Sequence, residues 1–206
     1  MTSWLEKFYI TFFLLLWFCL SLSFNVLGFY NPNASRLPLA FVNSIIFPPL
    51  IFAVAYRYSE RVREITHKLD LRLLTSLQAW RVLGGMFLVL YLHGLLPGMF
   101  AWPAAVGDLI VGIYAPFVAI AITNHTKHWP HHVFALSVIG LLDFAWALGT
   151  GLLSSSSPLG LLAGTVTTDL MQRLPLSLIP TFLVPLWIVF HIISLLQIRE
   201  KLSFRR

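Results

Sequence analysis

The side chains best suited to chemistry in this sequence are a few ionisable groups inside long apolar runs. Arg81, Asp143 and His191 each lie in such a run. Charged groups are costly in hydrocarbon unless they pair or bind something, and histidine titrates near neutral pH. The three residues also fall within about 6 Å of one another in depth if the runs are helices. We therefore expect an Arg81–Asp143 ion pair with His191 or Gln78 beside it, and these four residues form the candidate ligand-binding site.

A second candidate is a histidine–aspartate pair near one mouth of the membrane. His93 and Asp108 flank a short connecting segment, so the runs that carry them are expected to be antiparallel neighbours. A histidine and an aspartate that meet across such a turn can pass protons. The sequence thus predicts a proton pathway at His93 and Asp108. The alternative is that Asp108 lies in the second turn of a helix, where the helix dipole favours a negative charge.

Histidines are concentrated in the segment 125–132, which holds four of the seven in the chain. Neutral imidazoles bind Zn, Ni or Cu, so these four are candidate metal ligands: His125, His128, His131 and His132. The stretch His-Trp-Pro-His-His from His128 to His132 resembles one histidine box of the membrane desaturases and hydroxylases. That family builds a di-iron site from several boxes. The other boxes are missing from this sequence, so we reject a di-iron oxygenase.

Motifs of common enzymes and of retinal proteins are absent from the sequence. It has no Gly-x-Ser-x-Gly, His-Glu-x-x-His, phosphate-loop or Gly-x-Gly-x-x-Gly pattern, and no lysine at the centre of an apolar run. His93 and His191 are expected at different depths, so the two cannot hold one haem between them. The sequence requires no cofactor, and haem and metal both stay open.

These groups must be held by membrane-spanning helices, because the composition is that of a polytopic membrane protein. Of 206 residues, 58% are hydrophobic and 11% charged, against about 25% charged in soluble domains. Continuous apolar runs of this length are typical of spanning helices and exclude alternating strands. We predict an all-α integral membrane protein with one domain, 1–206, and six transmembrane helices at roughly 8–30, 37–58, 73–95, 103–124, 132–153 and 176–198.

The first run has a second interpretation as a signal peptide. Lys7 precedes it, and Ser21-Leu22-Ser23 has the small-x-small pattern of a cleavage site. The apolar run continues past Ser23, and Glu6 offsets the charge of Lys7. We therefore favour a retained helix.

The basic residues predict an orientation. Cytoplasmic loops collect lysine and arginine, and with six spans only Arg36 and Arg173 fall on one side. Both termini are therefore expected in the cytoplasm. The net charge of +6 reflects this topology and not nucleic-acid binding, and the compact loops fit a bacterial inner membrane. Eleven basic residues share the opposite side: Lys7, Arg57, Arg61, Arg63, Lys68, Arg72, Lys127, Arg199, Lys201, Arg205 and Arg206.

Small residues and prolines indicate how the helices pack. Glycines at 84, 85, 107 and 112 predict close contact between the third and fourth spans. Pro103 is well placed to open the fourth helix. Prolines inside the second and sixth spans free backbone carbonyls and so favour a polar interior. Arg-Leu-Pro-Leu occurs at both 36–39 and 173–176, either as a trace of duplication or by chance.

The longest connecting segment, 154–175, is expected on the outer side. Thr168 can cap a short helix in which Asp169 and Arg173 pair one turn apart. We expect this helix to lie along the outer surface, as a connector or as a lid over a site.

Three classes of function compete. The favoured one is a small transporter that binds an anionic or proton-coupled ligand at the polar cluster. The alternatives are a membrane-bound redox or lipid-modifying enzyme using haem, metal or quinone, and a non-catalytic membrane subunit or assembly factor. The lipid bilayer is the expected partner in each case, and a homo-oligomer or a partner subunit fits all three.

Overall fold

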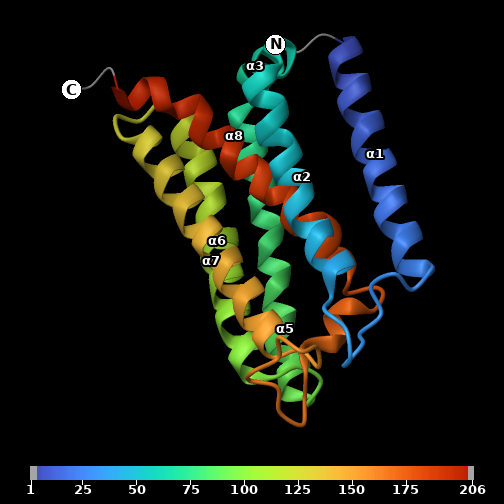
Figure 1. Ribbon diagram of the computed structural model, residues 1–206. Coiled ribbons are helices and arrows are strands. Elements are labelled where there is room, and N and C mark those ends of the chain that lie inside the picture. Colours follow the sequence, from blue (N-terminus) through green and yellow to red (C-terminus); the bar gives the residue numbers. More distant parts are fainter. Residues whose placement is uncertain (1–3, 204–206) are drawn as a thin grey trace.

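The computed structural model describes residues 4–203, and the regular elements among them are helices (Figure 1). Six of these helices are long and apolar enough to cross a membrane, which supports a multi-pass integral membrane protein and confirms the predicted number of spans. The spans are Trp4–Val26, Leu39–Tyr58, Leu71–Leu92, Gly98–Thr123, Trp129–Leu153 and Ile179–Arg199.

The first, second, fourth and fifth spans are single α-helices. They are α1 (Trp4–Val26), α2 (Leu39–Tyr58), α6 (Gly98–Thr123) and α7 (Trp129–Leu153). The prediction that Pro103 opens the fourth helix is wrong, because α6 begins at Gly98 and Pro103 lies inside it. A proline there forfeits one backbone hydrogen bond, which a helix packed among neighbours tolerates.

The third span changes helix type along its length. It consists of α4 (Leu71–Leu77), a 3-10 helix η1 (Gln78–Gly85) and α5 (Met86–Leu92). Asp70 caps its start, since its Oδ1 accepts a hydrogen bond from the backbone N–H of Arg72 at 2.8 Å. The η1 segment lies at the middle of the span, and its tighter winding decides which side chains share a face.

The sixth span begins with a π-helical turn, η3 (Ile179–Leu183), and continues as α8 (Val184–Ser203). Pro185 has no N–H to donate to a carbonyl of the preceding turn, and the residues just before it have the wider π-helical winding. Two short helices lie between spans: α3 (Glu60–Lys68) follows α2, and η2 (Thr168–Gln172) lies in the segment that connects α7 to the sixth span.

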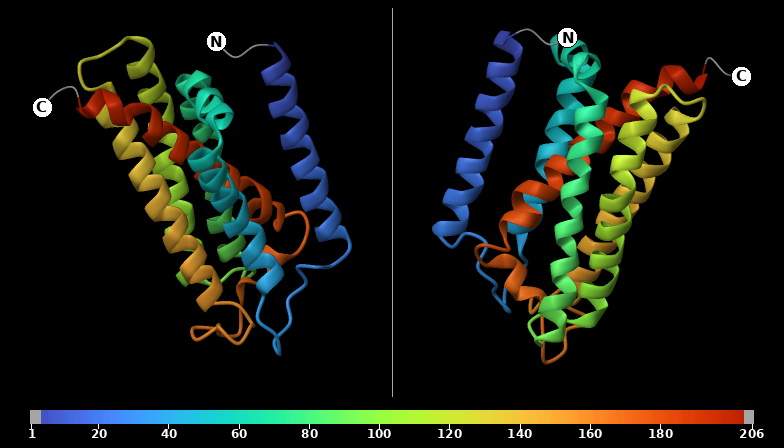
Figure 2. Two further views of the ribbon diagram at one scale, coloured as in Figure 1. Left: turned by 45° about the horizontal axis from the view of Figure 1, so that its top comes forward. Right: turned by 180° about the vertical axis from the view of Figure 1, so that it is seen from behind.

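The helices form a bundle from which α1 stands apart (Figures 1 and 2). Ion pairs tie the start of α1 to α3, with Glu6 lying 3.2 Å from Arg61 and 3.4 Å from Lys68. Farther along the helix, the hydroxyl groups of Ser21 and Thr181 lie 3.0 Å apart. The apolar core is built in layers around α6, with one layer near Leu71 and Ile122 and another near Phe87 and Phe100.

The start of α1 and the end of α8 lie at one end of the bundle, together with α3 and the α6–α7 connection (Figure 2). The structure therefore gathers most of the basic residues at this end, which we call the basic end. Arg36 and Arg173 follow α1 and η2 at the opposite end. Arg205 and Arg206, which contribute to the predicted charge bias, lie outside the described residues, as does the side chain of Lys201.

Candidate functional site

Arg81 is placed by the 3-10 helix η1. In a 3-10 helix, residues three apart lie in one row, and the buried residues of η1 are Gln78, Arg81 and Gly84. The row points into the bundle, where the Arg81 side chain is only 1% exposed although it lies at the midpoint of the Leu71–Leu92 span. Gln78 and Arg81 therefore share one face of η1.

Three helices supply partners to the Arg81 guanidinium. Its Nε donates to Asp108 Oδ1 on α6 at 2.7 Å, and its Nη2 donates to Asp143 Oδ2 on α7. Its Nη1 lies 3.3 Å from His191 Nε2 on α8. Because a guanidinium only donates, the His191 nitrogen accepts, and the imidazole carries its proton on Nδ1. The expected Arg81–Asp143 ion pair with His191 beside it is present. We call Arg81, Asp108, Asp143 and His191 the Arg81 cluster.

Glycines make the room that the cluster occupies. A Cβ at Gly84 would lie 2.6 Å from Asp108 Cγ, and one at Gly140 would lie 2.9 Å from Arg81 Nη1. A Cβ at Gly107 would overlap the Asp143 carboxylate. A Cβ at Gly112 would meet the backbone N of Val82 at 2.5 Å. The predicted close packing of the third and fourth spans is thus confirmed, and three of these glycines also house the cluster.

An aromatic ring covers the face of the guanidinium. Arg81 Cζ lies 3.9 Å from the centre of the Phe144 ring, a cation–π contact. Phe144 is in turn stacked on Trp187 of α8, with 6.3 Å between the ring centres. Phe144 and Gly140 were not among the predicted site residues. Their signal was spacing, because Gly140 lies one helical turn before Asp143 and Phe144 follows it directly.

The charges in the cluster do not favour an anionic ligand. Two carboxylates surround one guanidinium, which leaves one negative charge when both are ionised. The guanidinium has hydrogen-bond partners on all three nitrogens and is almost fully buried. An anion would therefore meet Asp108 and Asp143 before it met Arg81. The part of the predicted function that concerns an anionic ligand has no electrostatic support.

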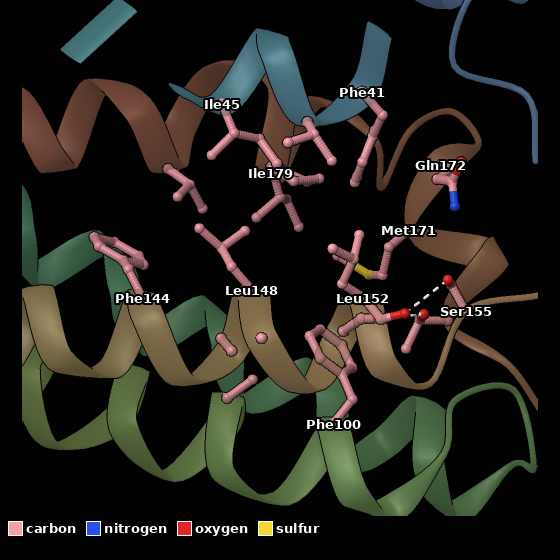
Figure 3. Close-up of a pocket in the computed structure, with 18 of the residues that line it drawn as sticks. Phe41, Ile45, Phe100, Phe144, Leu148, Leu152, Ser155, Met171, Gln172 and Ile179 are labelled. Carbon is pink, nitrogen blue, oxygen red and sulfur yellow. Dashed lines mark hydrogen bonds between the residues drawn. The ribbon is translucent and has the colours of Figure 1, made fainter. Parts of the chain in front are cut away.

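A cavity of about 270 Å³ adjoins the cluster and is lined mainly by apolar side chains. Figure 3 shows Phe41 and Ile45 of α2 on one side of it and Leu148 and Leu152 of α7 on the other. Asp108 and Asp143 both line it, while Ser155, Thr168 and Gln172 give it a polar end near η2. The arrangement can hold an apolar molecule with one polar group directed at the carboxylates.

Comparison with known proteins assigns the chain to a family. A family model described as a domain of unknown function, DUF8737, matches residues 37–199. The chain belongs to the DUF8737 family. The Arg81 cluster and the residues that line the cavity lie inside this range, whereas α1 precedes it. No curated protein and no solved structure matches the chain.

Within this DUF8737 chain, the predicted His93–Asp108 pair is wrong. His93 is exposed at the end of α5, and its Nδ1 donates to the backbone oxygen of Val89 at 2.8 Å. Asp108 instead belongs to the Arg81 cluster. Because α6 begins at Gly98 and not at Pro103, Asp108 lies three turns into the helix and not in its second turn. The helix dipole therefore does not explain it.

The four clustered histidines of the DUF8737 chain do not converge. His132 Nδ1 lies 2.7 Å from the hydroxyl of Tyr114, and the rings of His128 and His131 meet edge to face. Within residues 4–203, no three His, Cys, Asp or Glu side chains are grouped as a metal ion requires. His125 has a positive φ of 47° in the turn between α6 and α7. The predicted metal site has no geometric support here.

The predicted Asp169–Arg173 pair of the DUF8737 chain is also wrong. Asp169 Oδ1 accepts a hydrogen bond from the backbone N–H of Ser156 at 2.9 Å, and Arg173 is exposed. The short helix is a 3-10 turn in which Thr168 and Met171 are buried. It does not lie along the outer surface, because these side chains close one end of the cavity.

A pair of substitutions tests this correction. Asp169→Ala is expected to lower the free energy of unfolding by about 1 kcal/mol, because the Ser156 N–H loses its acceptor. Arg173→Ala is expected to change it by less than about 0.5 kcal/mol. Both are measured by denaturant titration in mixed micelles. Equal losses in the two variants would restore the Asp169–Arg173 pair.

Proposed function

We propose that this protein is a small proton-coupled transporter in which the Arg81 cluster is the coupling site. One observation carries the proposal: a single buried guanidinium is held by two carboxylates that also line an intramembrane cavity. A ligand in that cavity and a proton would compete for, or share, the same two carboxylates.

The charge balance of the cluster supports proton exchange. A net charge in a medium of low dielectric constant is costly, so a buried cluster is most stable when it is neutral. Two carboxylates, one guanidinium and a neutral His191 reach neutrality with one added proton. Asp108 and Asp143 can each accept it, and the two carboxyl groups titrate together as one coupled group. A cation bound in the cavity would neutralise the cluster in place of that proton.

A seam of buried polar side chains supports a route for the proton from the basic end of the bundle. On the third span, Gln78 and Thr75 lie three and six residues before Arg81 and are buried. On α8, Ser194 lies three residues after His191 and is also buried. Farther along α8, Gln197 donates to the backbone oxygens of Thr66 at 2.6 Å and Leu69 at 3.0 Å.

The side-chain oxygen of Gln78 is the point in this seam best suited to hold water. It is buried and has no hydrogen-bond partner among residues 4–203. Buried amide oxygens are nearly always paired with protein or with water. We propose that hydrated Gln78 connects the cluster to the basic end, so that the proton reaches the carboxylates by a route separate from the cavity.

The proposed orientation follows from the charges. Arg57, Arg61 and Lys68 lie at the basic end, and positively charged loops are retained in the cytoplasm. We therefore propose that the basic end faces the cytoplasm and that the proton route opens there. The η2 helix would then lie on the opposite side of the membrane.

Infrared difference spectroscopy on the protein in lipid nanodiscs tests the coupling site. Between alkaline and acidic pH, the wild type is expected to gain the carbonyl band of a protonated carboxyl in apolar surroundings. Asp143→Asn and Asp108→Asn are each expected to shift or abolish this band, because each removes one of the coupled carboxylates.

Asp70→Asn is the matched control. Asp70 lies outside the spans, and the hydrogen bond from the Arg72 side chain lowers the pKa of its carboxyl. Asparagine also preserves the helix cap. The apolar carbonyl band is expected to persist in this variant. If the band is the same in the wild type and in both cluster variants, the Arg81 cluster exchanges no proton and the proposal fails.

A further inference from the structure

We propose that the ligand of the cavity is a single-chain amphiphile with a protonated amine head group, taken up sideways from the bilayer. This inference rests on the proposed function and names the ligand class of the same site.

The carboxylates select the charge of the head group. Asp108 and Asp143 are the charged side chains among the described residues that line the cavity. Each uses one oxygen for Arg81. No side chain among the described residues donates to the other oxygen, which is Oδ2 beside Gly84 in Asp108 and Oδ1 beside Gly107 in Asp143. Asp108 is only 9% exposed, so its free oxygen is shielded from bulk solvent. An ammonium group supplies both the donors and the positive charge that these oxygens lack.

Aromatic walls favour the same head group. Phe87, Phe100 and Trp187 line the cavity together with Phe144. The faces of such rings attract ammonium groups, most strongly where water is excluded. A carboxylate or phosphate head group would meet the negative charge of the cluster instead.

The remainder of the cavity selects the tail. Between the carboxylates and the polar end at Ser155, Thr168 and Gln172, its lining is mainly aliphatic and aromatic, so it favours hydrocarbon. Its volume of about 270 Å³ lies just below the usual range of about 300–1,000 Å³ for small-molecule sites. A single alkyl chain fits this space, whereas a two-chain phospholipid exceeds it.

The opening of the cavity lies between α2 and α7. Ile46 of α2 lines the cavity and is 54% exposed. Gly149 of α7 also lines it and is exposed, and a Cβ added there would meet nothing within 4 Å. Exposed apolar positions within membrane spans face lipid. An amphiphile dissolved in the bilayer can therefore enter beside Gly149.

Binding of three matched amphiphiles to the wild-type protein in zwitterionic nanodiscs tests the head group without any substitution. Octylamine, octanol and octanoate share one chain and differ in head group. After subtraction of binding to empty nanodiscs, octylamine is expected to bind about 10- to 100-fold more tightly than octanol, and octanoate most weakly. Equal binding of the three, or tighter binding of octanoate, would overturn the proposed ligand class.

Two glycine substitutions test the opening without touching the cluster. Gly149→Phe is expected to weaken octylamine binding at least about tenfold by blocking the opening. Gly164→Phe is the control, since Gly164 is exposed, has the same free space around it and lies outside the cavity lining. If the two variants bind octylamine equally well, the ligand does not enter beside Gly149.

The two proposals fail in different ways. Octylamine binding without the infrared carboxyl band would overturn proton coupling and leave the ligand class intact. The infrared band without any preference for octylamine would overturn the ligand class and leave proton coupling intact.

Discussion

Replacement of Arg81 by leucine is expected to lower the free energy of unfolding by about 3–5 kcal/mol, the usual cost of removing one partner of a buried charge pair. The substitution would leave Asp108 and Asp143 close together with no cation between them. It would also deprive His191 Nε2 of its donor and Phe144 of its cation. Unpaired carboxylates in the middle of a membrane span are costly.

Denaturant titration in mixed micelles measures this loss, and two controls define it. Arg36→Leu, at an exposed position outside the spans, is expected to change stability by less than about 0.5 kcal/mol. Arg81→Lys keeps the charge but lacks the planar fork that reaches three partners, so it is expected to restore only part of the stability.

A double-mutant cycle then separates pairing from unrelated damage. Arg81→Leu combined with Asp143→Leu is expected to show a coupling of about 0.5–3 kcal/mol, because the second change removes a charge that the first left unpaired. Strict additivity would mean that the two side chains do not stabilise each other in the membrane. It would also remove the electrostatic basis of the proposed coupling site.

Gly140→Ala is expected to destabilise the protein by about 1–3 kcal/mol, as overpacking does in well-filled interiors. A Cβ there would lie 2.9 Å from Arg81 Nη1 and 2.6 Å from His191 Cε1. Neither side chain can withdraw freely, because Arg81 is held by three partners and His191 is buried. The added methyl group therefore has to displace the cluster.

Gly149→Ala on the same helix is the matched comparison. A Cβ at Gly149 meets nothing within 4 Å, so the substitution is expected to be neutral or to stabilise α7 by up to about 1 kcal/mol through helix propensity. Thermal unfolding in one detergent ranks the two variants. Equal stabilities would mean that the space beside Gly140 is not filled by Arg81 and His191.

Several features of the site could be predicted from the residues alone. Arg81, Asp143 and His191 are rare charged or titratable groups at similar depth in apolar runs, and groups of this kind must pair. The glycines of the third and fourth spans also predicted correctly where backbones approach. These inferences depend on composition and depth, which a helical rise of about 1.5 Å per residue converts directly into position.

Other features depended on local helix geometry that composition does not reveal. The position of Asp108 was misjudged because Pro103 resembles a helix start, whereas the helix begins at Gly98 and tolerates the proline. Gly140 and Phe144 were missed because only their spacing from Asp143 marks them, and glycines and aromatic residues are common in apolar runs. The expected Asp169–Arg173 pair assumed α-helical spacing in a turn that is 3-10.

Hydropathy and charge are properties of the chain itself, so six spans, an all-helical class and a charge bias toward one end can be derived without coordinates. Which polar groups meet depends on rotation about each helix axis and on contacts between spans distant in sequence. The 3-10 winding of η1 turns Arg81 toward α6, α7 and α8 at once. Only the tertiary structure therefore decides that one arginine serves two aspartates, and that both carboxylates line a cavity.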